Sequence, residues 1–395
     1  MTVLLPQVTE EFETHLLEIR NHLHAHPELS FQEFRTAAYV MEKLKSFGIT
    51  RIQNICETGV IALIEGNNPD KKCIALRADL DALPIQEENE VSYKSKHKGI
   101  MHACGHDVHT TCLLGAAFLL HHTRTQWQGT VKLIFQPGEE KSPGGASLLI
   151  EAGVLQYPKV EAIAGLHVAP DLKAGTAGFR PGAYMASADE IHLTIKGASG
   201  HAAMPHLAID PITIASQIIT SLQVIFSRKN NPLNPSVLSF GKIEGGTATN
   251  VIPDQVNILG TFRTFNERWR QEAKEIIEKT CASITQLYGA TYELKMPPGY
   301  PFLHNDAHVT SIVRQAAGEL LGSDNIIDLP MRMSSEDFSF YTQEIPGTFF
   351  RLGTNRDQQE FTHSVHSSKF DIDPKAIMTG VRLMTTAAFA LLEAG

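Results

Sequence analysis

The first half of the chain alternates helical patterns with short apolar runs, and this alternation restricts the fold more than any other feature. The run at residues 73–78 is nearly all apolar, so it predicts a strand that is buried on both faces of a sheet, and the runs at 130–135 and 162–166 predict further strands. Helical spacing of apolar residues at 10–24 and 108–120 precedes and separates these runs. This order favours an α/β fold, in which a layered mixed sheet carries helices on both faces.

The pattern changes after about residue 183, where half-exposed strands and longer helices replace the buried runs. The predicted elements there are strands at 191–195, 236–243 and 256–262 and helices at 210–226 and 267–287. Apolar helices after Ala307 and Pro374 then indicate a return to the first domain. We therefore expect one domain formed by residues 1–183 and 298–395, with a smaller α+β domain inserted at residues 184–297.

The charge and composition of the chain favour a cytoplasmic protein that acts on small molecules. Its 34 basic and 43 acidic residues occur without long blocks of one sign, which argues against nucleic acid as a partner. No stretch approaches the ~18 consecutive apolar residues of a membrane-spanning helix, which argues against a membrane as a partner. The first residues lack the basic start and the cleavage site of a signal peptide, and five scattered cysteines form no regular disulfide framework.

The segment 101–109 concentrates metal-binding side chains at the start of a predicted helix. It contains Cys104, three histidines including His106, and Asp107. Thiolate and neutral imidazole are good ligands for divalent metals, and a Cys-x-His spacing can direct both side chains to one point. The alternative is a structural helix start, in which Asp107 caps backbone N–H groups and Cys104 is a small buried hydrophobic residue.

Two adjacent carboxylates, Glu139 and Glu140, follow the predicted strand at residues 130–135. Neighbouring negative charges repel each other unless a positive charge lies beside them, and a metal ion would supply that charge. If Glu140 binds the metal, Glu139 can take a proton from the attacking water and pass it to the leaving amine. The alternative is an acidic turn exposed to solvent.

Further histidines follow other strands or lie in predicted loops of the same domain. His167 follows the predicted strand at residues 162–166, and His363 and His366 form a late cluster. A single histidine is usually structural. These histidines, however, share with Cys104 the edge at which layered α/β folds bind ligands.

An acidic pair, Asp79 and Asp81, follows the predicted strand at residues 73–78. Histidines that bind a metal commonly donate their second N–H to a carboxylate, so this pair can fix the orientation of the ligands. The alternative is a salt bridge with Arg77.

Together these segments resemble the aminoacylase and carboxypeptidase metallopeptidase family. More narrowly, they look like its amidohydrolase branch, which contains hippurate hydrolases, auxin-conjugate hydrolases and N-acetyl-diaminopimelate deacetylases. The resemblance follows the order of the family along essentially the whole chain, at residues 23–31, 77–84, 101–109, 136–140, 165–168 and 335–338. It implies that the domain of residues 1–183 and 298–395 is catalytic and that the inserted domain is a dimerisation (lid) domain.

The resemblance also implies a site with two divalent metal ions, zinc or manganese first, with cobalt or nickel also compatible. The implied ligands are Cys104, His106, Glu140, His167 and His366. His366 fits the family pattern better than His363 because Phe370 and Asp371 follow it at the right distance, although Ser368 replaces the usual proline.

The implied catalytic groups lie in three segments of the chain. Glu139 is the general acid and base, and Asp79 is the catalytic-site carboxylate, with Asp81 as its alternative. In the inserted domain, His201 would reach the active site of the partner in a homodimer and polarise the amide carbonyl. Asn250 and Arg263 would hold the carboxylate of the substrate.

The expected function is metal-dependent hydrolysis of the amide bond of N-acyl amino acids, which yields a carboxylic acid and an amino acid. One alternative is a dipeptidase or carboxypeptidase with the same two-metal site. Another is a non-catalytic protein that binds N-acyl amino acids. The presence of every implied ligand and of the implied base, Glu139, argues against this last alternative.

Overall fold

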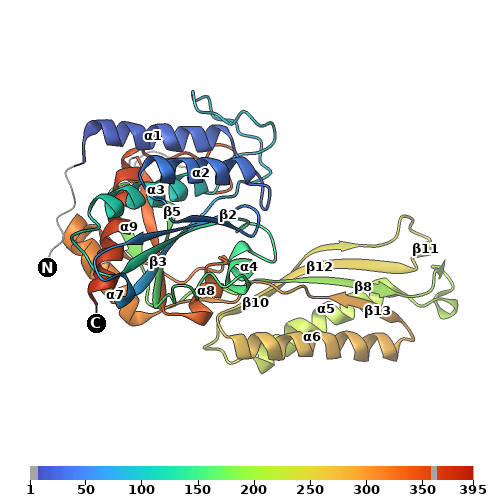
Figure 1. Ribbon diagram of the computed structural model, residues 1–395. Coiled ribbons are helices and arrows are strands. Elements are labelled where there is room, and N and C mark those ends of the chain that lie inside the picture. Colours follow the sequence, from blue (N-terminus) through green and yellow to red (C-terminus); the bar gives the residue numbers. More distant parts are fainter. Residues whose placement is uncertain (1–7, 357–362, 395) are drawn as a thin grey trace. The chain divides into compact units, whose positions relative to one another are not determined.

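The computed structural model describes residues 8–356 and 363–394, and the chain forms two compact units (Figure 1). The large unit consists of Met1–Tyr184, His304–Met331 and Asp337–Gly395. The small unit consists of Met185–Leu303 and Arg332–Glu336.

An eight-stranded mixed sheet forms the centre of the large unit, in the order β1-β2-β4-β3-β5-β16-β6-β15. Strand β3 is parallel to β4 and to β5, and β5 is parallel to β16, whereas β2 runs antiparallel to β4. The mixed α/β sheet predicted from the sequence is therefore confirmed. The strands are β1 (Ile52–Ile55), β2 (Gly59–Glu65), β3 (Cys73–Asp79), β4 (Thr130–Gln136), β5 (Ala162–Lys173), β6 (Ala177–Phe179), β15 (Ile326–Asp328) and β16 (Gly347–Asn355).

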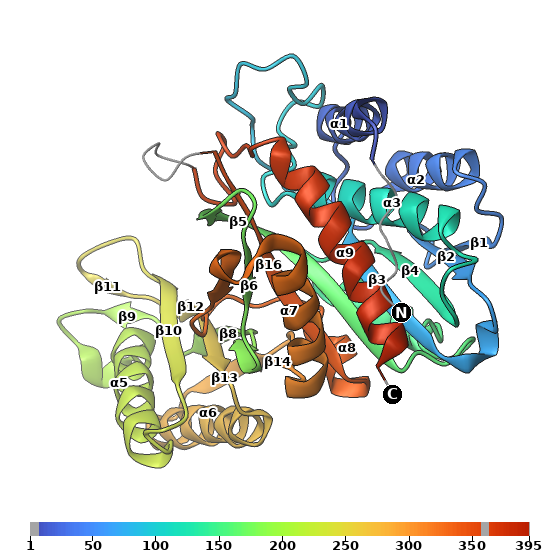
Figure 2. The same cartoon turned by 90° about the vertical axis from the view of Figure 1, so that its left-hand side faces the viewer.

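Helices cover both faces of this sheet. Helices α3 and α9 lie side by side on one face (Figure 2), whereas α4 and α8 contact each other and pack against β4 and β16. The side chains of Ala164 and Leu166 point towards α9, while a Cβ on Gly165 would meet Phe338 at the start of α8. The helices are α1 (Glu10–Ala25), α2 (Phe34–Ser46), α3 (His106–His122), α4 (Gly145–Glu151), α7 (Ala307–Leu321), α8 (Ser339–Glu344) and α9 (Lys375–Glu393).

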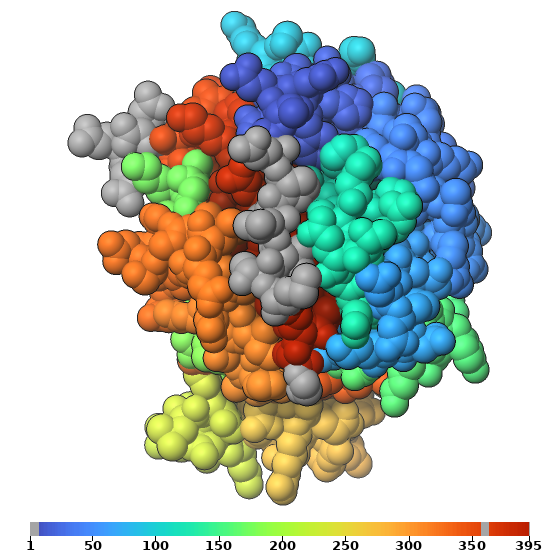
Figure 3. All heavy atoms as spheres, turned by 60° about the vertical axis from the view of Figure 1, so that its left-hand side comes forward, coloured from blue at the N-terminus to red at the C-terminus, as the bar shows by residue number. Residues whose placement is uncertain are grey.

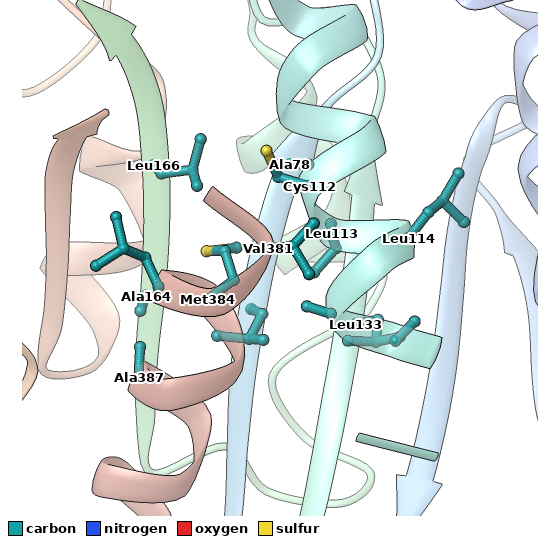
Figure 4. Close-up of a cluster of buried hydrophobic side chains, with 14 of the residues drawn as sticks. Ala78, Cys112, Leu113, Leu114, Leu133, Ala164, Leu166, Val381, Met384 and Ala387 are labelled. Atoms are coloured by element: carbon teal, nitrogen blue, oxygen red, sulfur yellow. The ribbon is translucent and has the colours of Figure 1, made fainter. Parts of the chain in front are cut away.

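Among the described helices, α3 and α9 form the most extensive helix–helix contact (Figure 4). Glycines permit this close approach, because a Cβ on Gly380 would lie 2.4 Å from Sγ of Cys112, and a Cβ on Gly115 would lie 2.4 Å from Val381. By length and composition α9 is the one helix of the described residues that could cross a membrane. Since 67% of its most apolar stretch is buried within the protein, it has the character of a core helix.

The two ends of the chain meet in this helical layer. Helix α1 contacts both α3 and α9. In the space-filling view the dark-blue surface of α1 lies next to the red surface of the C-terminal segment (Figure 3). Side chains of helix α1 and of the C-terminal segment can therefore contact the same buried groups.

The small unit is an antiparallel four-stranded sheet, in the order β10-β12-β8-β13, against which α5 and α6 pack. The side chain of Asp210 caps α5 by accepting hydrogen bonds from the backbone N–H groups of Ile212 and Thr213. The elements are β8 (Asp189–Lys196), β9 (Gly200–His201), α5 (Pro211–Lys229), β10 (Ser236–Glu244), β11 (Val251–Ile252), β12 (Gln255–Thr264), α6 (Glu267–Leu287) and β13 (Thr291–Lys295). Strands β7 (Gly182–Met185) and β14 (Leu303–Asn305) lie where the chain passes from one unit to the other, and three short 3-10 helices span Pro69–Lys71, Pro205–Leu207 and Ser323–Asn325.

One predicted strand end was wrong. The sequence predicts that the strand beginning at residue 162 ends before His167, whereas β5 continues to Lys173. Pairing with β3 does end at Gly165, but β16 continues to pair with residues 167–169 of β5 on its other side. His167 therefore lies within a strand, at the point where one of its two neighbouring strands has ended.

Candidate metal centre

Cys104, His106 and His167 come together at the edge of the sheet where the parallel strands β3 and β4 end. His106 begins α3, and the thiol of Cys104 lies just before that helix. The Sγ atom of Cys104 is 3.4 Å from Nε2 of His167, and the ligand atoms of all three residues lie within 4.8 Å of one another. All three side chains are buried. Their thiol and imidazole groups are the donors that divalent transition metals prefer.

Cys104 also belongs to a second set of ligand atoms. Its Sγ atom, a carboxylate oxygen of Glu140 and a ring nitrogen of His366 lie within 4.8 Å of one another. Nε2 of His366 is 3.2 Å from Oε1 of Glu140. The two sets together contain all five predicted ligands and share one sulfur atom. A thiolate in this position can bridge two cations.

The ring orientations of the two buried histidines fit a metal site. Nδ1 of His106 lies 3.1 Å from Oδ1 of Asp81, and Nδ1 of His167 lies 2.8 Å from the carbonyl oxygen of Val168. With Nδ1–H donating to an oxygen, the neutral form of each ring presents the lone pair of Nε2. Nε2 of His106 is buried and has no hydrogen-bond partner, which is costly unless a cation binds it. The residues present therefore fit a divalent metal ion.

The acidic character of the cluster also favours cations. Burial raises the pKa of the Cys104 thiol, so the thiolate form needs a positive charge beside it. Hydrogen bonds to Cys104 and Glu140 raise the pKa of His366 to about 10. The thiol and the carboxylate thus favour a positive charge at this position, and a bound metal ion would supply it.

Asp81 contacts the predicted ligands more directly than Asp79 does. Besides His106, Asp81 accepts hydrogen bonds from the backbone N–H of Glu140 at 3.0 Å and from the hydroxyl of Ser30 at 2.6 Å. It thus ties two predicted ligands to each other. Asp79 lies 3.8 Å from Nδ1 of His106.

Asp79 instead organises a buried network behind the ligands. It accepts a hydrogen bond from Arg77 at 2.5 Å and contacts Nδ1 of His109 at 2.6 Å. Nε2 of His109 then accepts the backbone N–H of Val168, the residue after His167, at 2.9 Å. The sequence analysis assigned no role to His109, although its place in the dense segment 101–109 was a signal.

The alternative histidine, His363, does not belong to any group of three potential metal ligands among the described residues. His366 lies on the same loop and belongs to the set that contains Cys104 and Glu140. Glu139 lies close to the ligands as well, since its carboxylate is within 4.8 Å of the ligand atoms of His106 and Glu140.

The predicted substrate-binding residues occupy two places in the small unit. His201 lies on β9, which pairs with β11, and the backbone N–H of Ala202 donates to the carbonyl oxygen of Asn250 at 3.0 Å. His201 and Asn250 are therefore neighbours, and both are exposed. Arg263 lies near the far end of β12 and donates a hydrogen bond to the carbonyl oxygen of Met333.

Comparisons with known proteins identify the family of this chain. The sequence model of peptidase family M20/M25/M40 matches residues 75–390. The chain belongs to this peptidase family. The resemblance inferred from the motifs is thus confirmed.

Several relatives are similar over most of this family member. An N-acetyl-L-cysteine deacetylase of Bacillus subtilis is 43% identical over 96% of this chain and 89% of its own length. An N-acyl-L-amino acid amidohydrolase of Geobacillus stearothermophilus is 43% identical over 76% of this chain and 81% of its own length. The YXEP protein of Bacillus subtilis, described as a dinuclear metal binding peptidase, has a TM-score of 0.85 at 38% identity, and the match covers 98% of this chain and all of that one. Two divalent metal ions are consistent with this family and with the two sets of ligand atoms.

A buried carboxylate outside the motifs fixes the turn before Glu139 and Glu140. Oε1 of Glu33 accepts hydrogen bonds from the backbone N–H groups of Gly138 and Phe31, at 2.8 and 2.9 Å. Its Oε2 accepts the hydroxyl of Thr58 at 2.8 Å. Sequence reasoning missed Glu33 because no local pattern connects it to a turn a hundred residues later. Burial, together with the nearby charge of Asp81, raises the pKa of Glu33 from its ordinary value of 4.5 to about 7.

This pKa predicts how Glu33 affects stability with pH. Between pH 4.5 and about 7 the unfolded chain releases the proton while the folded chain holds it. The contribution of Glu33 to the free energy of unfolding therefore falls as the pH rises, by up to ~1.4 kcal/mol per pH unit. Glu33→Gln lacks this proton, and its amide can still accept from the two N–H groups and donate to Thr58.

The measurement is urea unfolding of the wild type and Glu33→Gln in parallel, both metal-loaded, at pH 5, 6 and 7. We expect the wild type to lose stability relative to the variant as the pH rises. Because the metal centre is common to both proteins, its own pH dependence cancels in the difference. A difference that stays constant from pH 5 to 7 would show that Glu33 is ionised throughout this range.

Proposed function

We propose that this chain is a two-metal amidohydrolase that cleaves the amide bond of N-acyl amino acids and releases a carboxylic acid and a free amino acid. The observation that carries this proposal is the shared thiol of Cys104, which joins two sets of ligand atoms beside the carboxylate of Glu139. Relatives that are 43% identical are named for the hydrolysis of such amides. We propose zinc or manganese as the native ions, with cobalt or nickel as possible substitutes, since this mixed donor set accepts all four.

The proposed roles follow from the donor set. One ion would be held by His106 and His167 and the other by Glu140 and His366, with Cys104 between them. When bound, such ions polarise the amide carbonyl and make water more acidic. Glu139 would take the proton from the attacking water and deliver it to the leaving nitrogen. The position of Glu139 supports this role, because its buried carboxylate lies within 4.8 Å of ligand atoms of His106 and Glu140.

Replacing the base tests this role. Glu139→Gln keeps the size of the side chain but cannot accept the proton at neutral pH. We expect turnover to fall by roughly 10²–10⁴-fold while the number of bound metal ions stays the same. Steady-state kinetics and metal analysis of the same preparation measure both quantities. Full activity in the metal-loaded variant would rule out Glu139 as the proton carrier.

We further propose that the active enzyme is a homodimer formed through the small unit. Eight residues of β12 separate its start, near Asn250 and His201, from Arg263. At about 3.3 Å per residue this distance is roughly 26 Å, which is longer than a small N-acyl amino acid. A single substrate therefore cannot touch Arg263 and His201 of one chain. A second copy would have to supply one of them.

The exposed edge of the small unit supports this dimer. Strand β10 is an edge strand of the four-stranded sheet, and its side chains of Val237 and Ile243 are 36% and 55% exposed. An unpaired edge with apolar side chains is suited to pairing with another chain. His201 would then act on the amide carbonyl in the site of the partner, and its neighbour Asn250 would bind the substrate carboxylate there together with Arg263 of the other chain.

Subunit complementation tests the role of His201 in the partner. His201→Ala and Glu139→Gln should each lose most activity as homodimers. If His201 acts across the dimer, mixed dimers contain one complete site, so unfolding and refolding the two variants together should restore activity well above their sum. A mixture of Glu139→Gln with His106→Ala is the matched control, because each change disables the site of its own chain and no complete site forms. Restoration in neither mixture would mean that His201 acts within its own chain or not at all.

A substrate panel tests the reaction class. Metal-stripped protein would be loaded with zinc, manganese, cobalt or nickel and assayed with acetyl, benzoyl, long-acyl and indole-acetyl amino acids. Dipeptides with a free α-amine and carboxamide analogues that lack the carboxylate complete the panel. We expect activity only with metal, and the highest kcat/KM for acylated amino acids with a free carboxylate.

Two outcomes separate the alternatives. A higher kcat/KM for dipeptides would identify a dipeptidase or carboxypeptidase with the same metal centre. Binding of N-acyl amino acids without hydrolysis under any metal would identify a non-catalytic binding protein.

We also propose that the protein works in the cytoplasm, with neither nucleic acid nor a membrane as a partner. This proposal is supported by its net charge of -9 and by the absence of basic blocks in the sequence.

A further inference from the structure

Arg20 on α1 joins two carboxylates that are far apart in the sequence. Its Nε donates to Oδ2 of Asp107 at 3.0 Å, and its second terminal nitrogen donates to Oδ1 of Asp371 at 3.0 Å. The guanidinium is 3% exposed, and Asp107 is fully enclosed as well. Breaking such a buried pair is costly, so these contacts hold their segments firmly.

The two carboxylates belong to the segments that carry different predicted ligands. Asp107 directly follows His106 in the first turn of α3. Asp371 lies five residues after His366, at the end of the loop that carries this histidine. The guanidinium of Arg20 therefore connects the two segments that carry His106 and His366, one ligand from each set.

The segment of His366 depends on such outside support. The backbone of His366 has φ of 66°, in the left-handed region that is unfavourable for a residue with a side chain. Its N–H donates to the carbonyl oxygen of Ala103 at 2.8 Å, and the carbonyl oxygen of Ser368 accepts the N–H of Glu88 at 2.9 Å. The side chain of His366 itself is 53% exposed. Few apolar contacts can fix it, so polar contacts must do so.

Asp107 and Asp371 differ in how much they rely on Arg20. His24, one turn after Arg20, lies 2.7 Å from Oδ2 of Asp107, so Asp107 has a second buried partner. Asp371 otherwise contacts the hydroxyl of Tyr93 at 2.8 Å and the largely exposed side chain of Arg356 at 3.2 Å. Loss of Arg20 would therefore loosen the segment of His366 more than the start of α3.

We propose that Arg20 is a positioning residue that sets the affinity of the ion held by Glu140 and His366, and leaves the ion held by His106 and His167 largely unaffected. This inference rests on the ligand assignment of the proposed function. The guanidinium is suited to the role because its planar fork can donate to two carboxylates at fixed angles, which the point charge of a lysine cannot do.

The test uses full-length enzyme loaded with Co²⁺. Arg20→Lys keeps the charge but cannot span both carboxylates, and Asp371→Ala removes the contact to the loop while Arg20 remains paired with Asp107. Arg356→Met is the matched control, because it removes an exposed cation from the same Asp371. Each protein is dialysed against graded chelator, the retained ions are counted, and visible absorption reports the cobalt–thiolate bond of Cys104.

We expect wild type and Arg356→Met to release their two ions in the same two steps. Arg20→Lys and Asp371→Ala should release the first ion at chelator concentrations on the order of 10–100-fold lower, while the second ion and its thiolate absorption persist as in the wild type. If Arg20→Lys does not fold, Asp371→Ala carries the test alone.

Three results separate the possible outcomes. Release in both variants as in the wild type would overturn the positioning role. Parallel weakening of both ions, together with a lower unfolding temperature, would also overturn it, because Arg20 would then support only the fold. A wild type that holds fewer than two ions would contradict the ligand assignment itself.

Discussion

The thiol of Cys104, shared by two sets of ligand atoms, is the constraint on which the site in the large unit depends. Within each set the ligand atoms lie within 4.8 Å of one another, and the thiolate of Cys104 beside the carboxylate of Glu140 is unfavourable unless a cation neutralises the pair. The fold must therefore hold these donors in their deprotonated forms and in fixed orientations. Asp81 meets both needs, since it orients His106 and binds the backbone of Glu140.

The two sets of donors are supported in different ways. His106 and His167 stand on α3 and β5, which are elements of the hydrophobic core, and their rings are fixed by Asp81 and by a backbone carbonyl. Glu140 and His366 stand on loops that polar contacts from distant segments hold in place. The network of Arg20 and the carboxylate of Glu33 are such contacts. The second set thus depends on buried polar contacts more than on apolar packing.

The sequence predicted those features that local patterns determine. Strand β3 is buried throughout because most of its residues are apolar, and the ligand-rich segment at Cys104 is visible as unusual composition. The end of β5 was wrong because its continuation depends on β16, which is about 180 residues away in the chain. Glu33 and Arg20 were missed for the same reason. Their partners, Gly138 and Asp371, are neighbours only in the folded protein.

A centre of this kind can activate the carbonyl of any amide that reaches it, so selectivity among amides must come from another property of the site. A dipeptide brings a protonated α-amine close to the scissile carbonyl, where two divalent cations repel it unless a carboxylate is placed to bind it. The acyl group of an N-acyl amino acid is neutral at that position and has no such cost. The carboxylate is common to both kinds of substrate, so Arg263 and Asn250 would favour each of them equally. The charge of two bound ions would therefore favour acylated substrates over peptides with a free amine.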